Sequence, residues 1–315
     1  MSNMNKTAGI LMAVMVGLIY GDLLFSQNTD ENLVLNGGFE SYDSCFTGTF
    51  DKYMGFPLKH WINVGMSLPE YFNDQYKGCH SKTRFAYGRY VDAFYAEAYK
   101  GHGYIGQAPL CLYYKANEAR YGNNSLPGYM EPVLGVLKAP LQKDSLYRVS
   151  IAILSPKTNS YNVKSISIIF LRDSLISPIG SRSFSEFRNL FMYFQEHPPV
   201  SILSFSLLEV IQKRQEWIVY DTIYKAKGGE KYIFLGFYPK FKAEEIEKFK
   251  KIAERENKRG IVAERSKILK ILLKRYTFYK HPADKTEYPY KTPYLYYDEV
   301  SVVPHRKNFS IRWVK

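Results

Sequence analysis

The chain has 315 residues, of which 46% are hydrophobic and 16% aromatic, and it carries a formal net charge of +13. The length suits one elaborated domain or two small ones and is ample for a packed core. The charge is unevenly placed, with 14 Lys and Arg against 6 Glu between Lys240 and Lys280, so it does not indicate a nucleic-acid-binding protein.

The first 26 residues are typical of an export signal. Lys6 supplies a charged start, residues 7–20 form an uncharged apolar run, and the small Ser26 precedes the predicted cleavage point. An uncleaved anchor is the alternative, but the run is roughly 14 residues and a bilayer span needs about 20. We therefore expect residues 27–315 to be exported to the cell surface, the periplasm or the medium, with no transmembrane segment after cleavage.

Most of the chain from Asn32 to Pro239 shows a β pattern. Alternating or continuous apolar runs predict four clear strands, at residues 146–154, 163–171, 217–224 and 231–238. Gly228-Gly229 marks a turn between the last two. Several short strands with turns between them, and no helix at βαβ spacing, predict an all-β sandwich.

Two segments depart from this β pattern. Apolar side chains recur at helical spacing between Ser183 and Val200, which predicts a helix or loop that covers an edge of the sandwich. Residues 243–279 carry apolar side chains on one face on both sides of Gly260, which predicts a helical hairpin inserted before the last strand, at about residues 240–280. Its basic face fits a solvated surface, and if it binds a partner, an anionic polymer or lipid headgroups fit better than DNA.

The two ends of the exported part carry the most informative pattern. Residues 32–40 read Asn-Leu-Val-Leu-Asn-Gly-Gly-Phe-Glu, and residues 295–302 read Leu-Tyr-Tyr-Asp-Glu-Val-Ser-Val. This opening and closing resemble the first and last strands of a galactose-binding-like jelly roll, a sandwich that many carbohydrate-binding modules use. The resemblance implies a jelly-roll β-sandwich that binds a ligand and catalyses no reaction.

Several shorter stretches resemble, in order, the amino-terminal domain of Gram-negative surface proteins that often carry an OmpA-like peptidoglycan-binding domain. They lie at residues 44–45, 68–73, 98–99, 103–104, 129–131, 137–141, 147–150 and 225–232, together with Trp61 and Cys79. No OmpA-like stretch follows the closing strand, so the resemblance does not imply peptidoglycan anchoring.

The resemblance also implies a structural Ca²⁺ where the first and last strands meet. Ca²⁺ takes six to eight oxygen ligands, and Glu40 and Asp298 would supply carboxylates, with backbone carbonyls from the turn between Asn36 and Gly38. Glycine lets the backbone of this turn bend so that its carbonyls converge. The alternative is plain strand pairing with both carboxylates solvated or hydrogen-bonded.

The three cysteines, Cys45, Cys79 and Cys111, allow three disulfide pairings in an oxidising compartment. The resemblance implies a Cys45–Cys79 bridge, which leaves Cys111 as a free thiol. In the chain-entropy model, closing a loop of about 34 residues would stabilise the fold by about 3 to 4 kcal/mol.

A sugar-binding surface needs exposed aromatic faces beside polar hydrogen-bonding groups. The candidate rings lie in the long segments between the early strands, and Trp61 also fits a core position; they are Trp61, Tyr87, Tyr90, Tyr95 and Tyr104. The sequence contains no Gly-x-Ser-x-Gly, no His-Glu-x-x-His and no glycine-rich phosphate loop, and its six histidines are scattered. We therefore expect no enzymatic activity.

The sequence as a whole predicts an exported binding module that takes carbohydrate at the cell envelope or outside the cell. Its partner would be a glycan or another envelope polymer, and nucleic acid is not expected. The alternative is a structural or adhesion component of the envelope that contacts other proteins through the helical insertion.

Overall fold

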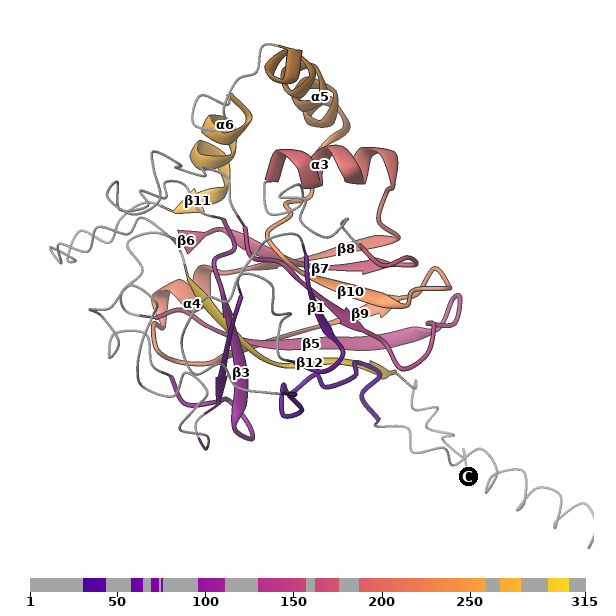
Figure 1. Ribbon diagram of the computed structural model, residues 1–315, viewed down its shortest axis with the longest axis vertical. Helices are drawn as coiled ribbons and strands as arrows, with labels where there is room; N and C mark the ends of the chain where they lie inside the picture. The colour runs from indigo at the N-terminus through magenta and orange to yellow at the C-terminus, as the bar shows by residue number, and fades with distance from the viewer. Residues whose placement is uncertain are drawn as a thin grey trace, which may run out of the picture.

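The computed structural model describes residues 31–43, 58–64, 69–73, 75, 96–110, 130–156, 162–175, 187–258, 267–278 and 294–305. They form two five-stranded antiparallel sheets packed face to face, with helices on one side (Figure 1). This confirms the predicted all-β sandwich.

The first sheet has the strand order β1-β4-β10-β7-β8, and the second sheet has the order β2-β3-β12-β5-β9. The strands of the first sheet are β1 (Trp61–Asn63), β4 (Val133–Val136), β10 (Tyr232–Gly236), β7 (Ser165–Leu171) and β8 (Ser201–Ser206). The strands of the second sheet are β2 (Glu70–Asn73), β3 (Gly103–Gln107), β12 (Leu295–Pro304), β5 (Leu146–Leu154) and β9 (Ile218–Lys225). A short separate pair joins β6 (Asn162–Val163) to β11 (Thr277–Phe278).

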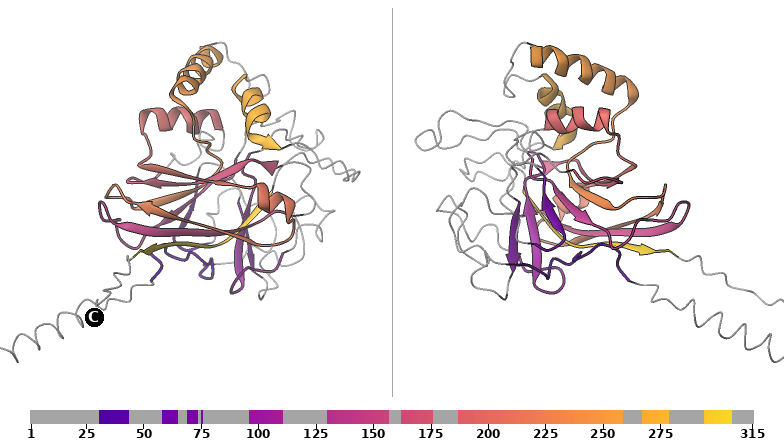
Figure 2. Two further views of the ribbon diagram at one scale, coloured as in Figure 1. Left: turned by 180° about the vertical axis from the view of Figure 1, so that it is seen from behind. Right: turned by 45° about the vertical axis from the view of Figure 1, so that its right-hand side comes forward.

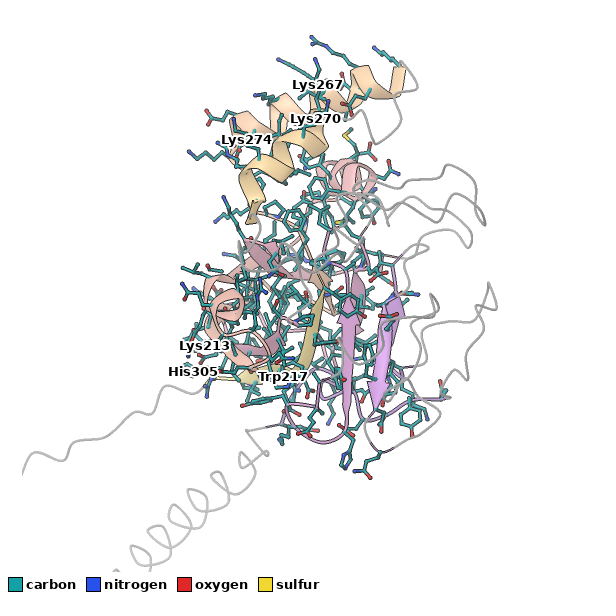
Figure 3. All side chains as sticks on the ribbon, turned by 90° about the vertical axis from the view of Figure 1, so that its left-hand side faces the viewer. Lys213, Trp217, Lys267, Lys270, Lys274 and His305 are labelled. Atoms are coloured by element: carbon teal, nitrogen blue, oxygen red, sulfur yellow. The ribbon has the colours of Figure 1, made fainter. Side chains whose placement is uncertain are left out.

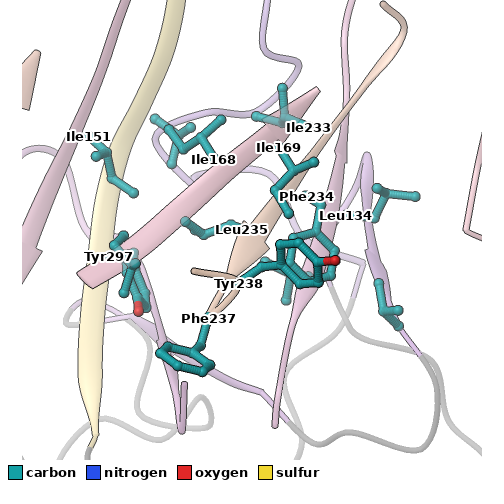
Figure 4. Packing of buried hydrophobic residues seen from close by; sticks show 14 of the residues in the cluster. Leu134, Ile151, Ile168, Ile169, Ile233, Phe234, Leu235, Phe237, Tyr238 and Tyr297 are labelled. Atoms are coloured by element: carbon teal, nitrogen blue, oxygen red, sulfur yellow. The ribbon is translucent and has the colours of Figure 1, made fainter. Parts of the chain in front are cut away.

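The core lies between the two sheets and follows from the two-residue period of the strands. On β5 the alternating Val149, Ile151 and Ile153 are buried. Figure 4 shows Ile151 facing Ile168 and Leu235 of the first sheet. A stacked ring pair, Phe170 and Tyr224, joins the sheets with centroids 4.3 Å apart.

The segment from Glu31 to Asp43 contacts both sheets. The backbone N–H of Leu33 donates to the carbonyl of Val302 on β12, while the carbonyl of Leu33 accepts from Lys138, just beyond β4. The N–H of Val300 donates to the carbonyl of Gly37. The opening and closing motifs of the sequence therefore lie side by side, as their resemblance to the ends of a jelly roll implies.

The helix α3 (Phe187–Glu196) packs on the outer face of the first sheet. The ring centroid of its Phe194 lies 6.0 Å from that of Phe234 and 4.9 Å from that of Tyr238. Because Phe234 belongs to β10, the middle strand of that sheet, the helix covers a face of the sandwich, and the prediction that this segment covers an edge is wrong. The sequence pattern shows which side of the helix is apolar but not which surface of the sheet receives it.

Two further helices, α5 (Ala243–Lys258) and α6 (Lys267–Tyr276), lie between β10 and β12 in the chain and form a layer beyond α3 (Figure 2). Phe249 of α5 packs edge-on against Phe191 of α3, with centroids 5.7 Å apart. The short α4 (Leu208–Gln212) connects β8 to β9. Among the described residues, no helix combines the length and apolarity that a membrane crossing requires.

Candidate functional site

The outer face of the second sheet is the face that no described helix covers (Figures 1 and 2). Strand alternation and register place two cross-strand rows of side chains on it at one end. One row contains Glu70, Tyr296 and Leu154, and the neighbouring row contains Phe72, Tyr104, Asp298, Ala152 and Val219. Farther along β5, β9 and β12 the same face carries Ser150, Ser301, Asp221, Arg148, Ile223 and Val303. We call this surface the outer face.

One end of the outer face is an aromatic cluster that is separate from the main core. Phe72 stacks on Tyr104 with centroids 5.0 Å apart, and Tyr296 meets both rings edge-on, at 5.4 and 5.3 Å. Edge-to-face and offset arrangements of this kind are the favourable ones for aromatic rings. All three rings are at most 8% exposed, so this end of the outer face is packed rather than open.

A carboxyl group lies within this aromatic cluster. Glu70 accepts a hydrogen bond from the hydroxyl of Tyr294, and burial raises the pKa of Glu70 to about 7. The neighbouring Tyr296 hydroxyl is buried and has no hydrogen-bond partner among the described residues. The ionised form of Glu70 is therefore disfavoured at this position.

The edge of the outer face along β9 is open to solvent. Val219 and Ile223 of β9 are 47% and 46% exposed, although most large apolar side chains of a strand are buried. Between them, Asp221 forms an ion pair with Arg148 at 2.9 Å, and both side chains are well exposed. Apolar and charged groups thus alternate over this part of the surface.

Two aromatic rings stand at the border between the packed end and the open edge along β9. Trp217 lies directly before β9 (Figure 3). It is half-buried against Tyr104, with ring centroids 6.1 Å apart. Its indole N–H donates to the carbonyl of Glu97 at 2.9 Å. Its ring also lies 6.2 Å, centroid to centroid, from Tyr99, which is 46% exposed. The Trp217 indole is therefore held by a hydrogen bond, and the Tyr99 ring beside it is exposed to solvent.

Two carboxylates hold the segment that carries Tyr99. Asp298 Oδ2 accepts from the backbone N–H groups of Tyr99 and Lys100, at 2.9 and 3.1 Å. Glu40 Oε1 accepts from the N–H groups of His102 and Gly103, at 2.8 and 2.9 Å. Both ends of this five-residue turn are fixed, so the Tyr99 backbone is preorganised.

The pKa of Asp298 is raised to about 7, chiefly by burial and also by the nearby Glu299, although three backbone N–H donors oppose the shift. The third donor is the N–H of Glu299, which reaches Asp298 Oδ1 at 2.7 Å. Glu299 sits at a β-bulge with φ of 46°, and this bulge lets both Asp298 and Ser301 face outward.

The structure places all four residues of the predicted calcium site. Asn36 does not fit as a ligand, because its side chain bonds the backbone of Ser41 and Lys59 and its carbonyl accepts the indole N–H of Trp61. Gly38 lies against the Glu299 carboxylate. Glu40 and Asp298 present negative charge to the same turn, where a cation would compete with backbone donors. Among the described residues, no three His, Cys, Asp or Glu side chains form a metal-binding group, so a Ca²⁺ site with two carboxylates stays a prediction.

Only two of the five predicted ligand-binding rings belong to the described part of the chain. Trp61 is 3% exposed and packs against Phe39 at 4.9 Å, and Tyr104 is 1% exposed within the aromatic cluster. Trp61 therefore occupies the core position that its sequence context also fits, and Tyr104 is a packed ring of the aromatic cluster and not an exposed platform. Tyr87, Tyr90 and Tyr95 lie outside the described residues, as do Cys45, Cys79 and Cys111.

Sequence reasoning missed both Tyr99 and Trp217 as site residues. Trp217 was assigned to the start of a strand, and Tyr99 to a stretch of family resemblance. The available signal was the strand that follows Trp217, where apolar residues occupy both alternating faces. That pattern is typical of a strand whose outer face is also used for packing or binding.

Comparison with known proteins identifies no family. No family model matches the chain, and no curated protein matches it. Among solved structures, a CBM4 structure is similar at 9% identity, covering 86% of this chain and 99% of its own, with a TM-score of 0.33.

Two adhesin domains of Lys-gingipain are similar to the same extent. The K1 domain, from Porphyromonas gingivalis W83, has 8% identity, covers 80% of this chain and 94% of its own, and has a TM-score of 0.34. The K2 domain has 8% identity, covers 82% and 98%, and has a TM-score of 0.31. Because these TM-scores are below 0.5, the fold is assigned from the two sheets themselves.

Proposed function

We propose that this protein is an exported, non-enzymatic binding module that takes a glycan on the outer face of its second sheet. The observation that carries the proposal is the exposed Tyr99 ring, held beside Trp217 by the Asp298 and Glu40 carboxylates. The site would be the border between the packed aromatic cluster and the open edge of the outer face along β9.

The chemistry of this border suits a sugar better than a purely apolar ligand. The flat face of a pyranose carries C–H groups that pack on an aromatic ring, and its hydroxyls need hydrogen-bonding partners. Tyr99 and Trp217 would supply the rings, while Arg148 and Asp221 lie farther along the same face with exposed polar atoms. Since the backbone of Tyr99 is already fixed, binding would cost little ordering of the site.

A glycan array probed with the full chain tests this proposal, followed by titration of the best-binding glycan. Tyr99→Ala removes an exposed ring and should weaken binding at least about tenfold, which corresponds to about 1.4 kcal/mol, while Tyr99→Phe should retain most of the affinity. Ile62→Ala is the matched control, because Ile62 is 40% exposed on the first sheet. Equal affinity of Tyr99→Ala and the wild type, or no binding to any glycan, would contradict the proposal.

Protein contacts through the helical insertion are the alternative function. In that case the chain would show no glycan binding, and it would co-purify with envelope proteins until residues of the insertion are replaced. The two functions are distinguished by which substitution abolishes binding. Glycan binding should be lost on replacement of Tyr99, and co-purification with envelope proteins on replacement of residues in the insertion.

A further inference from the structure

The positive charge of the two inserted helices is concentrated on one of them. Helix α5 has five basic and five acidic residues in the sequence AEEIEKFKKIAERENK. Helix α6, with the sequence KILKILLKRY, has four basic residues and no acidic one. The basic surplus that the sequence shows for this region is therefore, within the two helices, a property of α6.

Two acidic residues of α5 fix α6 against it. Glu256 Oε1 accepts the backbone N–H of Lys267 at 2.6 Å, at the first turn of α6. Glu245 forms an ion pair with Arg275 in its last turn. Leu272 of α6 is fully buried in the main core. The helix is thus held at both ends and along its apolar side.

Three lysines of α6 remain free after these contacts. Lys267, Lys270 and Lys274 are all exposed, and none of them forms an ion pair with a described residue. Spacings of three and four residues place them on one face of the helix, over about 10 Å of its length. Figure 3 shows the three side chains along α6 at one end of the molecule. We call this row the lysine stripe.

The electric dipole of the helix does not explain the lysine stripe. Cations are favourable at the carboxyl end of a helix, which accounts for Lys274 and Arg275. Lys267 lies at the amino end, where a cation is unfavourable and an acidic residue would be expected. The helix therefore carries basic side chains along its whole length, and the only acidic groups that contact it among the described residues are Glu256 and Glu245 of α5.

The position of α6 limits the shape of any partner of the lysine stripe. The helices project from the sandwich on the side away from the outer face (Figures 1 and 2), and Figure 3 places Trp217 and the lysine stripe far apart. A projecting helix with a row of charges matches an extended surface better than a small ligand in a pocket. Both surfaces could be occupied at once.

We propose that the lysine stripe binds the phosphate-bearing headgroups of an anionic membrane surface. The compact ammonium of lysine suits phosphate as a point charge, without the fixed geometry that arginine requires. The buried Leu272 is committed to the core, so attachment would be peripheral and driven by charge. This inference goes beyond glycan binding and does not depend on it.

Sedimentation of the full chain with lipid vesicles tests the proposal. One set of vesicles contains phosphatidylcholine alone, and the other contains phosphatidylcholine mixed with phosphatidylglycerol. Because each basic residue near an anionic surface strengthens binding by about fivefold, K267Q/K270Q/K274Q should weaken partitioning to the anionic vesicles by about 100-fold. Binding by wild type should also fall as salt rises, since the Debye length shortens from about 10 Å at 0.1 M to about 3 Å at 1 M.

A matched variant distinguishes the effect of the lysine stripe on vesicle binding from the effect of the net charge of the protein. K143Q/K227Q/K231Q removes the same charge from exposed lysines of the sandwich and should leave partitioning unchanged within about twofold. Equal losses in the two variants would overturn the proposal, because net charge alone would then explain binding. So would equal wild-type binding to neutral vesicles, which would indicate attachment through the apolar amino-terminal run. Binding to soluble heparin without binding to anionic vesicles would also overturn it.

Discussion

Asn32 and Val302 are joined by a hydrogen bond although 270 positions separate them, since the N–H of Val302 donates to Asn32 Oδ1 at 3.0 Å. The same oxygen accepts from the N–H of Val34 at 3.0 Å, and Asn32 Nδ2 donates to the carbonyl of Val300 at 2.9 Å. One side chain thereby satisfies three backbone groups where the start of the described chain meets β12. The Asn32 side chain thus makes hydrogen bonds to β12 of the kind that a neighbouring strand would make, although Asn32 itself lies outside the named strands.

Asn32→Ala should therefore destabilise the fold. The change leaves two backbone N–H groups and one carbonyl without their partner, and each unsatisfied buried group costs about 1–3 kcal/mol, reduced where water can reach it. We expect a loss of about 2–3 kcal/mol in the free energy of unfolding, measured by urea denaturation. Glu31→Ala is the control, because it removes only an exposed ion pair with Lys138 and should change stability by less than about 1 kcal/mol.

The fold was largely predictable from the period of the apolar residues. The strand predicted at residues 146–154 coincides with β5, because Tyr147, Val149 and Ile151 alternate with the polar Arg148 and Ser150. The position of α3 was not predictable, since its phenylalanines could bury themselves equally well against an edge or a face. The residue that receives α3 on the sheet is Phe234. It lies on a strand with apolar side chains on both faces, so the sequence does not show which face a helix covers.

Of the candidate site, the sequence predicted only that the first and last motifs of the exported part lie together. Residues 32–40 and 295–302 were expected to meet, and Glu40 and Asp298 do flank a common segment. The identity of that segment could not be inferred, because the bonds are between side chains and backbone N–H groups that any residue supplies. Tyr99 and Trp217 are 118 positions apart and no local pattern connects them.

Gly101→Ala should disturb the turn between Asp298 and Glu40. Gly101 has a φ of 65°, and a Cβ there would lie 2.2 Å from Glu40 Oε1. The left-handed conformation alone costs about 1–2 kcal/mol for a residue with a side chain, and displacement of Glu40 would add the loss of its hydrogen bonds. We expect a larger drop in melting temperature, and weaker glycan binding, than for the control.

The control is Gly229→Ala. Gly229 also has a positive φ, of 86°, but a Cβ there meets no atom closer than 3.5 Å. It therefore reports the conformational strain without the collision. If the two alanine variants lose the same stability and bind glycan equally, the collision with Glu40 has no consequence, and the turn does not depend on that carboxylate.

Glu70 should make the protein more stable in mild acid than at neutral pH. Its pKa rises from 4.5 to about 7 on folding, so the folded state binds more protons than the unfolded state between these two values. Stability from this group is therefore fully present below about pH 4.5 and is lost as the pH rises through about 7. Glu70→Gln keeps a neutral acceptor for Tyr294 and should show a weaker dependence of melting temperature on pH in this range.

The comparison at pH 8 is the sharpest one for Glu70. There the wild type carries an unfavourable buried charge and Glu70→Gln does not, so the variant should melt at a higher temperature. Glu209→Gln serves as the control, because Glu209 is exposed and paired with Lys213, and its pH profile should follow the wild type. A variant less stable than the wild type at pH 8 would show that Glu70 is ionised and well solvated in the fold.

Removal of Ca²⁺ should lower the melting temperature if the predicted calcium site exists. A ligand present at 100 times its dissociation constant stabilises a protein by about 2.7 kcal/mol, which for a domain of this size corresponds to about 5–10 °C. Excess EDTA should produce this shift in the wild type, and readdition of Ca²⁺ should reverse it. In Glu40→Gln, which loses one carboxylate facing Gly103, EDTA should have little effect. A melting temperature that EDTA leaves unchanged, together with no Ca²⁺ in metal analysis, would mean that backbone N–H groups alone satisfy Glu40 and Asp298.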